Sequence, residues 1–552
     1  MRPLWQRSSF LSALVEHNRH EIDQLERSVR FRVGRALTFG WRRPWRWWSA
    51  ASEIVGALAD GRAAHFDAVH SALATTPAGA YPDDGDGRQL SELRRRNAEL
   101  VAQIEAIEGS RAFAVGSALA ERRGPRRVLN ELSGKRARNP RAQPRFEPPV
   151  DQPREEPVAV AACGPAWFTE LMAAGWPVVA VGEADLVVGL GGEDCERELQ
   201  RAGARGQTTA RWDDFHFEPA IAPEIHNPIG WWQGTKGARA DFEGRAPEHW
   251  RRAFDAARGL YSAAGQLDQV FADLPIAEIS VAGPWGERAR RVAIMRAIHE
   301  RHTVGHRIRR LCVELGLPVP ELEPLVAVVV CSNRPENLAR VVANLARLDY
   351  PRLEVGFVAH GAGFDLGPLV ELCQERGYPL RHTRAPESLN IGQVRQLSHE
   401  LSSGTWLAKL DDDDHYGPGY VRDGVWQARM GSAAMVVKGA PIVEFGGESR
   451  LQAAPVTRHF RYLMSPGAGG MLLRRDVALG IGVRPVERWE DRGLVLDFAR
   501  AGMPILCSDP FNYVYRRGRA GGHNWELERS EVIAAMSLEV AGENLRAGDF
   551  CF

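Results

Sequence analysis

The chain has 552 residues, 44% of them hydrophobic, and its 70 basic side chains balance its 70 acidic ones to a formal net charge of zero. This length exceeds one ordinary domain, and the neutral balance excludes an overall attraction to nucleic acid or to an anionic membrane. Seven scattered cysteines without a CxxC pair argue against a disulfide framework or a zinc knuckle, and they indicate a reducing compartment.

Residues 1–132 are predicted to be a helical, coiled-coil region with an internal repeat. The segment "LERSVRFRVGRAL" at 25–37 matches "IEGSRAFAVGSAL" at 107–119, and each copy follows a stretch of apolar heptads. Asn18 and Asn97 fall on the apolar seams, where an asparagine often sets register and oligomer state. The pattern suits helices packed on their own chain and equally suits a homo-oligomer, because three heptads are marginal alone.

Arginine alternates with tryptophan in "FGWRRPWRWWSAA" at 39–51. Such a segment suits a peripheral membrane contact, single-stranded nucleic acid, or packing against a partner domain, and nucleic acid is the least favoured of the three. No apolar run approaches the ~18 residues of a membrane span, and the N-terminus lacks the apolar core of a signal peptide. We expect a cytoplasmic protein, with contact at the inner face of a membrane left open. Pro- and charge-rich residues 133–157 are predicted to be a flexible linker.

Residues 158–322 are predicted to form a Rossmann-like accessory domain. Short apolar strands in "PVAVAAC", "PVVAVG" and "ADLVVGLGG" alternate with a helical segment, which favours a parallel sheet. The turn "VGLGGED" lacks the GxGxxG spacing and is a weak phosphate loop.

Three histidines recur at helical spacing in "IMRAIHERHTVGHRIRRL", namely His299, His302 and His306. They could face one metal, but no HExxH pattern accompanies them, so core or interface positions are favoured. The ending "HTVGHRIRRL", with "HNPIGWW" before it, resembles the C-terminal half of spore-maturation-type GT-B glycosyltransferase-like proteins.

Residues 323–526 show the sharpest α/β pattern. "LVAVVVCSNRPEN" reads as a buried strand and polar turn, "LEVGFVAHG" as a second strand, and "GTWLAKLDDDD" as a third that ends in aspartates. Open α/β sheets bind ligands outside the carboxyl ends of their strands. We therefore expect "CSNRPEN" and the aspartates on one ligand-binding edge. A C-terminal helix or tail, 527–552, closes the chain.

Four consecutive carboxylates, Asp411 to Asp414, repel one another unless they are solvated or neutralised by a cation. An acidic surface turn is one interpretation. A calcium EF-hand fails, because position six would be Tyr416 instead of glycine and position twelve Arg422 instead of glutamate. A hard divalent cation, Mn²⁺ or Mg²⁺, held together with ligand phosphates is the other interpretation.

The motifs from about 324 to 526 resemble, in order, those of a family-2 glycosyltransferase of the GT-A fold. They are "VVCSNRPENL", "NIGQVRQLSHELSSGTWLAKLDDDDHYGP" with its Gly-x-x-Arg helix and Asp-x-Asp strand, "SPGAGGMLLRRDV" and "RWEDRGLVLDFARAGMPI". The resemblance implies a nucleotide-diphosphate sugar donor, a glycan or glycolipid acceptor, Mn²⁺ or Mg²⁺ as cofactor, and inversion at the anomeric carbon.

The resemblance also assigns roles to residues of this chain. As catalytic base it implies Asp491, with Glu490 beside it, and as metal ligands Asp413, Asp411 and His523. The implied donor-binding residues are Asn333, Arg334, Arg395, Asp411, Asp412, Arg516 and Arg517, and the implied acceptor-side residues are Gly469, Gly470 and Trp489.

One position departs from the family's pattern. Where members carry an acidic residue that recognises uracil, this chain has His360 and Gly361, with Asp365 further along. The nucleotide base of the donor is therefore open. A catalytically degenerate scaffold and a nucleotidyltransferase are the competing interpretations, although "CSNRPEN" lacks the glycine-rich loop that a nucleotidyltransferase would carry.

Overall fold

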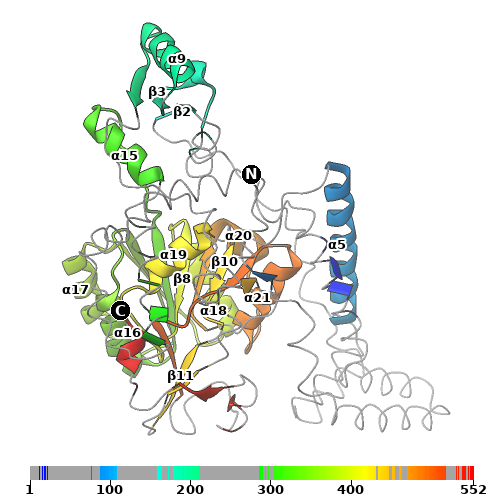
Figure 1. Cartoon of the computed structure of the whole chain (residues 1–552). Coiled ribbons are helices and arrows are strands. Elements are labelled where there is room, and N and C mark those ends of the chain that lie inside the picture. The colour runs from blue at the N-terminus through cyan, green and yellow to red at the C-terminus, as the bar shows by residue number, and fades with distance from the viewer. Residues whose placement is uncertain are drawn as a thin grey trace, which may run out of the picture.

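The computed structural model has a nine-stranded sheet at its centre (Figure 1). The structure describes, besides shorter pieces, residues 87–108, 158–164, 178–190, 192–211, 304–430, 433–439, 441–446, 451–453, 469–517 and 547–552. Strand order in the large sheet is β1-β13-β15-β10-β14-β8-β5-β6-β7. This mixed core agrees with the α/β class that the sequence predicts.

Four parallel strands form one half of the sheet: β5 (Val326–Ser332), β6 (Leu353–His360), β7 (Leu380–Ala385) and β8 (Trp406–Leu410). All residues of β5 and β8 are buried. A continuous apolar strand is typical of a parallel sheet covered on both faces, and "LVAVVVC" has that pattern. The predicted strands and their common carboxyl edge are confirmed.

The other half of the sheet is mixed. Strand β14 (Met471–Arg474) runs antiparallel between β8 and β10 (Met435–Val437), and β15 (Ile505–Cys507) is parallel to β10. The short strands β13 (Arg461–Tyr462) and β1 (Thr76–Pro77) complete this edge. The edge strand β1 therefore comes from the N-terminal region, outside the predicted boundary at 323.

Helices cover both faces of the sheet. On one face α18 (Ile391–Leu401) packs against β5 and β6, and it contacts α20 (Arg475–Ile481) and α21 (Glu490–Arg500). On the other face lie α16 (Leu338–Arg347) and α19 (Tyr420–Met430), with α17 (Gly367–Arg376) against α16. Side chains of a strand alternate between the two faces, so each residue of β8 points to one helix layer or the other.

A second sheet holds the acidic turn in place. Its order is β17-β12-β11-β16-β9, and the strands are β17 (Glu539–Val540), β12 (Gln452–Ala453), β11 (Ile442–Phe445), β16 (Tyr513–Arg517) and β9 (His415–Tyr416). Strand β9 follows the aspartates directly and pairs antiparallel with β16. This pairing brings residues about 100 positions apart to one side of the turn.

The central region has a small parallel sheet of its own, which stands apart from the large sheet (Figure 1). It consists of β2 (Val160–Cys163), β3 (Leu186–Gly189) and β4 (Thr208–Arg211), covered by α9 (Glu193–Ala204) and by α15 (Val304–Glu314), which shares its core. The predicted parallel arrangement is confirmed for β2 and β3. The strand predicted at "PVVAVG" is wrong, because this segment forms only an isolated parallel bridge at Val178 and a 3-10 turn at Val181–Glu183, and β4 was not predicted. The first turn of α9 carries three carboxylates, which disfavour a phosphate at "VGLGGED".

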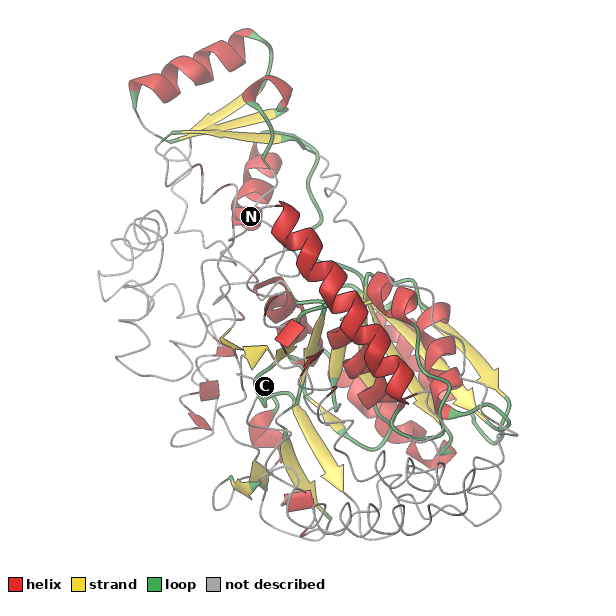
Figure 2. Ribbon diagram, turned by 90° about the vertical axis from the view of Figure 1, so that its right-hand side faces the viewer, coloured by secondary structure: helices red, strands yellow, loops and turns green. Residues whose placement is uncertain are grey.

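Helix α5 (Gly87–Glu108) contains the second predicted heptad stretch and lies beside the main domain (Figure 2). The side chain of Asn18 is fully buried and donates from Nδ2 to Oδ1 of Asn97, 2.7 Å away. Asn97 in turn donates to the carbonyl oxygen of Arg500 at the end of α21, 3.2 Å away. The two seam asparagines therefore pair with each other inside one chain. The segment 39–51, the linker 133–157 and His523 lie outside the described residues.

Segments at both ends of the predicted glycosyltransferase region also pack on its core. Trp285 donates to the carbonyl of Ala541 and stacks edge-on against Phe550, which is fully buried. Arg296 makes a two-pronged ion pair with the buried Asp423.

Among the helices that the structure describes, none combines the length and the apolar character that a membrane crossing needs.

Candidate active site

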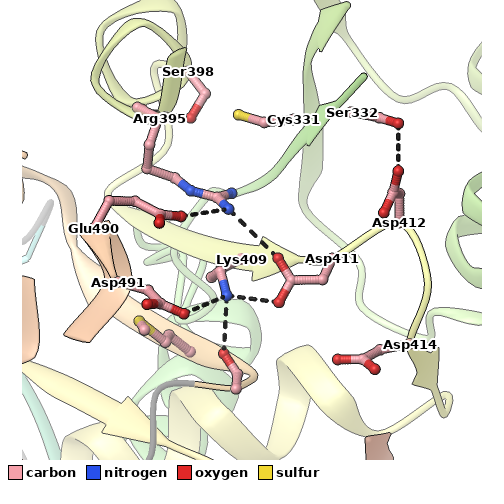
Figure 3. Close-up of polar contacts among 12 residues, drawn as sticks. Cys331, Ser332, Arg395, Ser398, Lys409, Asp411, Asp412, Asp414, Glu490 and Asp491 are labelled. Carbon is pink, nitrogen blue, oxygen red and sulfur yellow. Dashed lines mark hydrogen bonds and ion pairs between the residues drawn. The ribbon is translucent and has the colours of Figure 1, made fainter. Parts of the chain in front are cut away.

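The acidic run begins where β8 ends, next to the polar turn that follows β5. The two strands are parallel neighbours, and Ser332 at the end of β5 lies 2.5 Å from Oδ2 of Asp412. The expected meeting of "CSNRPEN" and the aspartates at one sheet edge is therefore confirmed. Figure 3 shows the polar side chains that gather there.

Alternation along β8 sends Lys409 and Asp411 to the face covered by α18. Register pairs Lys409 with Val329, whose side chain lies beneath α18. The Lys409 ammonium is 2.6 Å from Oδ2 of Asp411, and Nη2 of Arg395 on α18 is 3.4 Å from Oδ1. Asp411 thus stands between two basic side chains that are each at most 6% exposed.

Arg334 binds the middle two aspartates. It forms a two-pronged ion pair with Asp412 through Nε and Nη2, and Nη2 also lies 2.9 Å from Oδ2 of Asp413. Burial alone would lower the pKa of Arg334, but bonds to the two carboxylates outweigh it and raise the pKa. Asp412 is buried beneath this contact, whereas Asp413 keeps partial exposure. Asp412 is therefore placed to hold Arg334 on the donor side, and its donor-binding role stays a prediction.

Asp414 faces the second sheet. It accepts hydrogen bonds from the Tyr513 hydroxyl at 2.7 Å and from the backbone N–H of Arg516 at 2.9 Å. Burial, with the nearby charges of Asp411 and Asp413, raises the pKa of Asp414 well above its usual range. This carboxyl is enclosed, so the outward-facing members of the run are Asp411 and Asp413, the two that the Asp-x-Asp spacing indicated.

A second acidic pair opens helix α21. Trp489 precedes it with a φ of 68°, a left-handed conformation that is uncommon outside glycine, and its indole is exposed. Glu490 is 8% exposed and lies 3.5 Å from Arg395. Burial and the adjacent Asp491 raise the pKa of Glu490. Asp491 is more open, with 29% of its side chain exposed, and accepts from the N–H of Arg492.

Lys409 lies between the acidic run and the acidic pair of α21. Its ammonium lies 2.6 Å from Asp411, 3.5 Å from Oδ2 of Asp491 and 3.5 Å from the carbonyl oxygen of Gly469 (Figure 3). Burial alone would lower the pKa of Lys409, but the carboxylates of Asp411 and Asp491 raise it. Sequence reasoning missed this residue. A lysine alternating with apolar residues in a buried strand was the available signal, because a buried ammonium needs a carboxylate partner.

The remaining predicted site residues surround this centre. Gly469 and Gly470 precede β14, and a Cβ at Gly469 would lie 2.5 Å from the Tyr513 hydroxyl, so the backbone can approach only as glycine. Asn333 is exposed beside Arg334. Arg516 is partly exposed and paired with Glu444, whereas Arg517 is buried and bonds the Tyr515 hydroxyl. The donor-binding role of Arg517 stays a prediction.

The acidic run supplies only part of the ligands of a cation site. Among the residues that the structure describes, no cluster of three or more His, Cys, Asp or Glu side chains is placed to hold a metal ion. Mn²⁺ and Mg²⁺ in nucleotide sites, however, take one or two carboxylates and complete their shell with phosphate oxygens and water. The partly exposed oxygens of Asp411 and Asp413 fit that smaller demand. A metal at Asp413 would compete with Arg334 for the carboxylate.

No protein-family model matches the sequence, and no curated protein matches it either. Solved structures resemble part of the chain. They include S. aureus TarS 1-349 in complex with UDP-GlcNAc (16% identity, 36% of this chain and 60% of that chain, TM-score 0.30). The mannosyltransferase PcManGT from Pyrobaculum calidifontis in complex with GDP-Man and Mn²⁺ is 15% identical over 42% of this chain and 69% of that chain, TM-score 0.30.

GalNAc-T7 with UDP, GalNAc and Mn²⁺ is also similar, with 12% identity over 36% of this chain and 45% of that one, at a TM-score of 0.29. The chain thus covers about three fifths of S. aureus TarS 1-349, and each match spans less than half of the present chain.

Proposed function

We propose that this protein is an inverting, metal-dependent glycosyltransferase that moves a sugar from a nucleotide diphosphate to a hydroxyl acceptor. One observation carries the proposal. Two acidic groups from separate elements, Asp411 at the end of β8 and Asp491 at the start of α21, face one another across a single buried ammonium at the carboxyl edge of the sheet. Such an arrangement provides one carboxylate for the donor and another for the acceptor.

The donor side consists of the β5 turn and the acidic run. Arg334 and Asn333 lie on this turn, and an arginine fork suits diphosphate oxygens. A divalent cation bound at Asp413 would stabilise negative charge on the leaving diphosphate. His523 remains a predicted further ligand. The nucleotide base stays open, because His360 is half-buried at the end of β6 and Asp365 binds the N–H of Gly367.

The acceptor side consists of α21 and the glycine pair before β14. Asp491 is the more exposed of the two acidic residues and is placed to take a proton from the acceptor hydroxyl. Glu490, whose pKa is raised by burial, is tied to Arg395 and supports the site from beneath. A single base and direct displacement invert the configuration at the sugar carbon. The exposed Trp489 offers an aromatic face on which a sugar ring can lie.

The resemblance to family-2 enzymes extends the proposal to a glycan or glycolipid acceptor and to cell-surface polysaccharide synthesis. A cytoplasmic location, a peripheral membrane contact through 39–51 and a homo-oligomer through the N-terminal helices belong to the same proposal.

The test is a panel of nucleotide sugars, incubated with Mn²⁺ or with chelator, in which release of the nucleoside diphosphate is measured. Calorimetry with UDP and GDP, each with and without Mn²⁺, reports binding independently of turnover. We expect one nucleotide to bind in a Mn²⁺-dependent way and its sugars to be consumed. Binding without any consumption would support a scaffold, and neither binding nor consumption would remove the proposal.

A further inference from the structure

The buried ammonium of Lys409 contacts both the acidic run, through Asp411, and the acidic pair of α21, through Asp491. Among the described residues, its oxygen partners include groups from three different parts of the chain: Asp411 at the end of its own strand, Asp491 on α21, and the carbonyl of Gly469 before β14. Only 5% of the Lys409 side chain is exposed, whereas 27% of Asp411 and 29% of Asp491 remain open. The Lys409 ammonium is therefore buried between two carboxylates that are partly exposed to solvent.

Both oxygens of Asp491 are restrained in this arrangement. Oδ2 points to the Lys409 ammonium at 3.5 Å, and Oδ1 accepts the N–H of Arg492 at 2.7 Å. These two contacts restrict the rotation of the carboxylate, which is 29% exposed. A base that is already oriented avoids the cost of ordering it during the reaction, and small displacements of reacting groups are expensive in rate.

Asp411 is restrained by the same ammonium. Oδ2 contacts Lys409 at 2.6 Å, while Oδ1 faces Arg395 at 3.4 Å. Arg395 also lies 3.5 Å from Glu490, so a second basic side chain crosses from the donor side to α21 (Figure 3). The Arg395 link is longer at both contacts, and the tighter connection between Asp411 and Asp491 is the one through Lys409.

We propose that Lys409 is a positioning residue that holds the donor-side Asp411 and the base Asp491 at a fixed spacing across the reaction centre. The proposal rests on the function proposed above and deepens it. Lys409 touches neither sugar nor phosphate and acts through the two carboxylates. Because the same ammonium contacts the carbonyl oxygen of Gly469, Lys409 also holds the acceptor-side backbone relative to the two carboxylates.

The test is a pair of double-mutant cycles on the full-length protein. Lys409→Met keeps the length of the side chain and removes the charge. Its two partners retain solvent access, so the variant is expected to fold, and thermal unfolding checks this. We expect turnover of the best nucleotide sugar, with water as acceptor, to fall about 10- to 100-fold, and Mn²⁺-dependent affinity for the free nucleoside diphosphate to fall about 3- to 10-fold.

The effect of Lys409→Met in two mutant backgrounds distinguishes a positioning role from a structural one. In an Asp491→Asn background, Lys409→Met should change turnover at saturating nucleotide sugar by less than about twofold, because the base it positions is already lost and the effect through Asp411 appears in affinity. In an Asp411→Asn background, it should change nucleotide affinity by less than about twofold. A lysine that merely stabilises the fold would give the same losses in every background. Lys409→Arg, which keeps the charge, should restore part of both losses.

Lys438→Met is the matched control. The side chain of this lysine, which directly follows β10, is 3% exposed, and its ammonium pairs with Asp509 at 3.1 Å and not with a carboxylate of the acidic centre. Its backbone N–H, which bonds the carbonyl of Gly470, is kept in the variant. It should lower thermal stability without lowering turnover per folded molecule. Full additivity in both cycles would overturn the positioning role while leaving the glycosyltransferase proposal intact. A wild type that binds no nucleotide and consumes no nucleotide sugar would overturn both.

Discussion

The sharpest prediction concerns Asp491, the proposed base. Asp491→Asn keeps the shape of the side chain and its Oδ1 acceptor for the N–H of Arg492, and it removes the basicity. General-base contributions are typically ~10²–10⁴-fold, which corresponds to about 3–5 kcal/mol in the activation barrier. Turnover should fall by that factor. Affinity for the nucleoside diphosphate should stay within about threefold, because the lost interaction acts in the transition state.

Stability should barely change. The Asp491 carboxylate is 29% exposed and 3.5 Å from the Lys409 ammonium, and partly exposed ion pairs contribute at most about 1 kcal/mol. A loss of turnover would therefore not reflect unfolding, and the melting temperature can be checked directly.

Asp476→Asn is the matched control for this experiment. Asp476 lies in the first turn of helix α20, accepts the N–H of the next residue at 2.8 Å and pairs with Arg474, but it lies outside the acidic centre. Its substitution should leave turnover unchanged. Donor binding measured by calorimetry beside turnover separates the two roles of Asp491. Loss of nucleotide affinity with turnover per complex retained would refute the assignment and would place Asp491 in the donor site, with Glu490 the next candidate for the base.

Three further outcomes are expected. Asp413→Asn should abolish the Mn²⁺-dependent part of nucleotide binding and leave the fold intact, which calorimetry with and without Mn²⁺ measures. Gly392→Ala should cost about 1–3 kcal/mol in thermal unfolding, because its Cβ would lie 1.9 Å from the backbone oxygen of Arg484, whereas Gly203→Ala, with open space around it, should be neutral or slightly stabilising. Burial lowers the pKa of His399 to about 3, so below about pH 6.5 the unfolded chain binds a proton that the folded chain does not bind. The free energy of unfolding should therefore fall by about 2 kcal/mol between pH 6.5 and pH 5. In the His399→Gln variant, the free energy of unfolding should depend less on pH over this range.

Local patterns were sufficient for the elements that carry the site. The apolar runs of β5 and β8 were long enough to identify buried strands, and the polar residues after each were expected at one edge. The heptads of α5 were recognised, and its seam asparagine proved to be paired within the chain. The spacing of Asp411 and Asp413 identified the two members of the run that stay open.

Partnerships between distant residues were not readable in this way. Arg334 is 78 positions from Asp412, and Tyr513 is 99 from Asp414, yet these contacts decide which aspartates are buried. The sequence shows Lys409 as a charged residue in an apolar strand, and only the packing of α21 against this strand provides its partner Asp491. The edge strand β1 and the packing of Trp285 and Phe550 likewise depend on where the chain returns.

The sequence by itself determined the strands, the sheet edge and the concentration of carboxylates there, because periodicity and side-chain alternation act over a few residues. Only the tertiary structure decided how that charge is balanced. Four adjacent carboxylates can be tolerated in several ways, and which one applies depends on the cations that packing brings within a few ångströms. Here Arg334, Lys409 and Arg395 come from a turn, a strand and a helix to meet three of the aspartates, and burial against Tyr513 raises the pKa of the fourth.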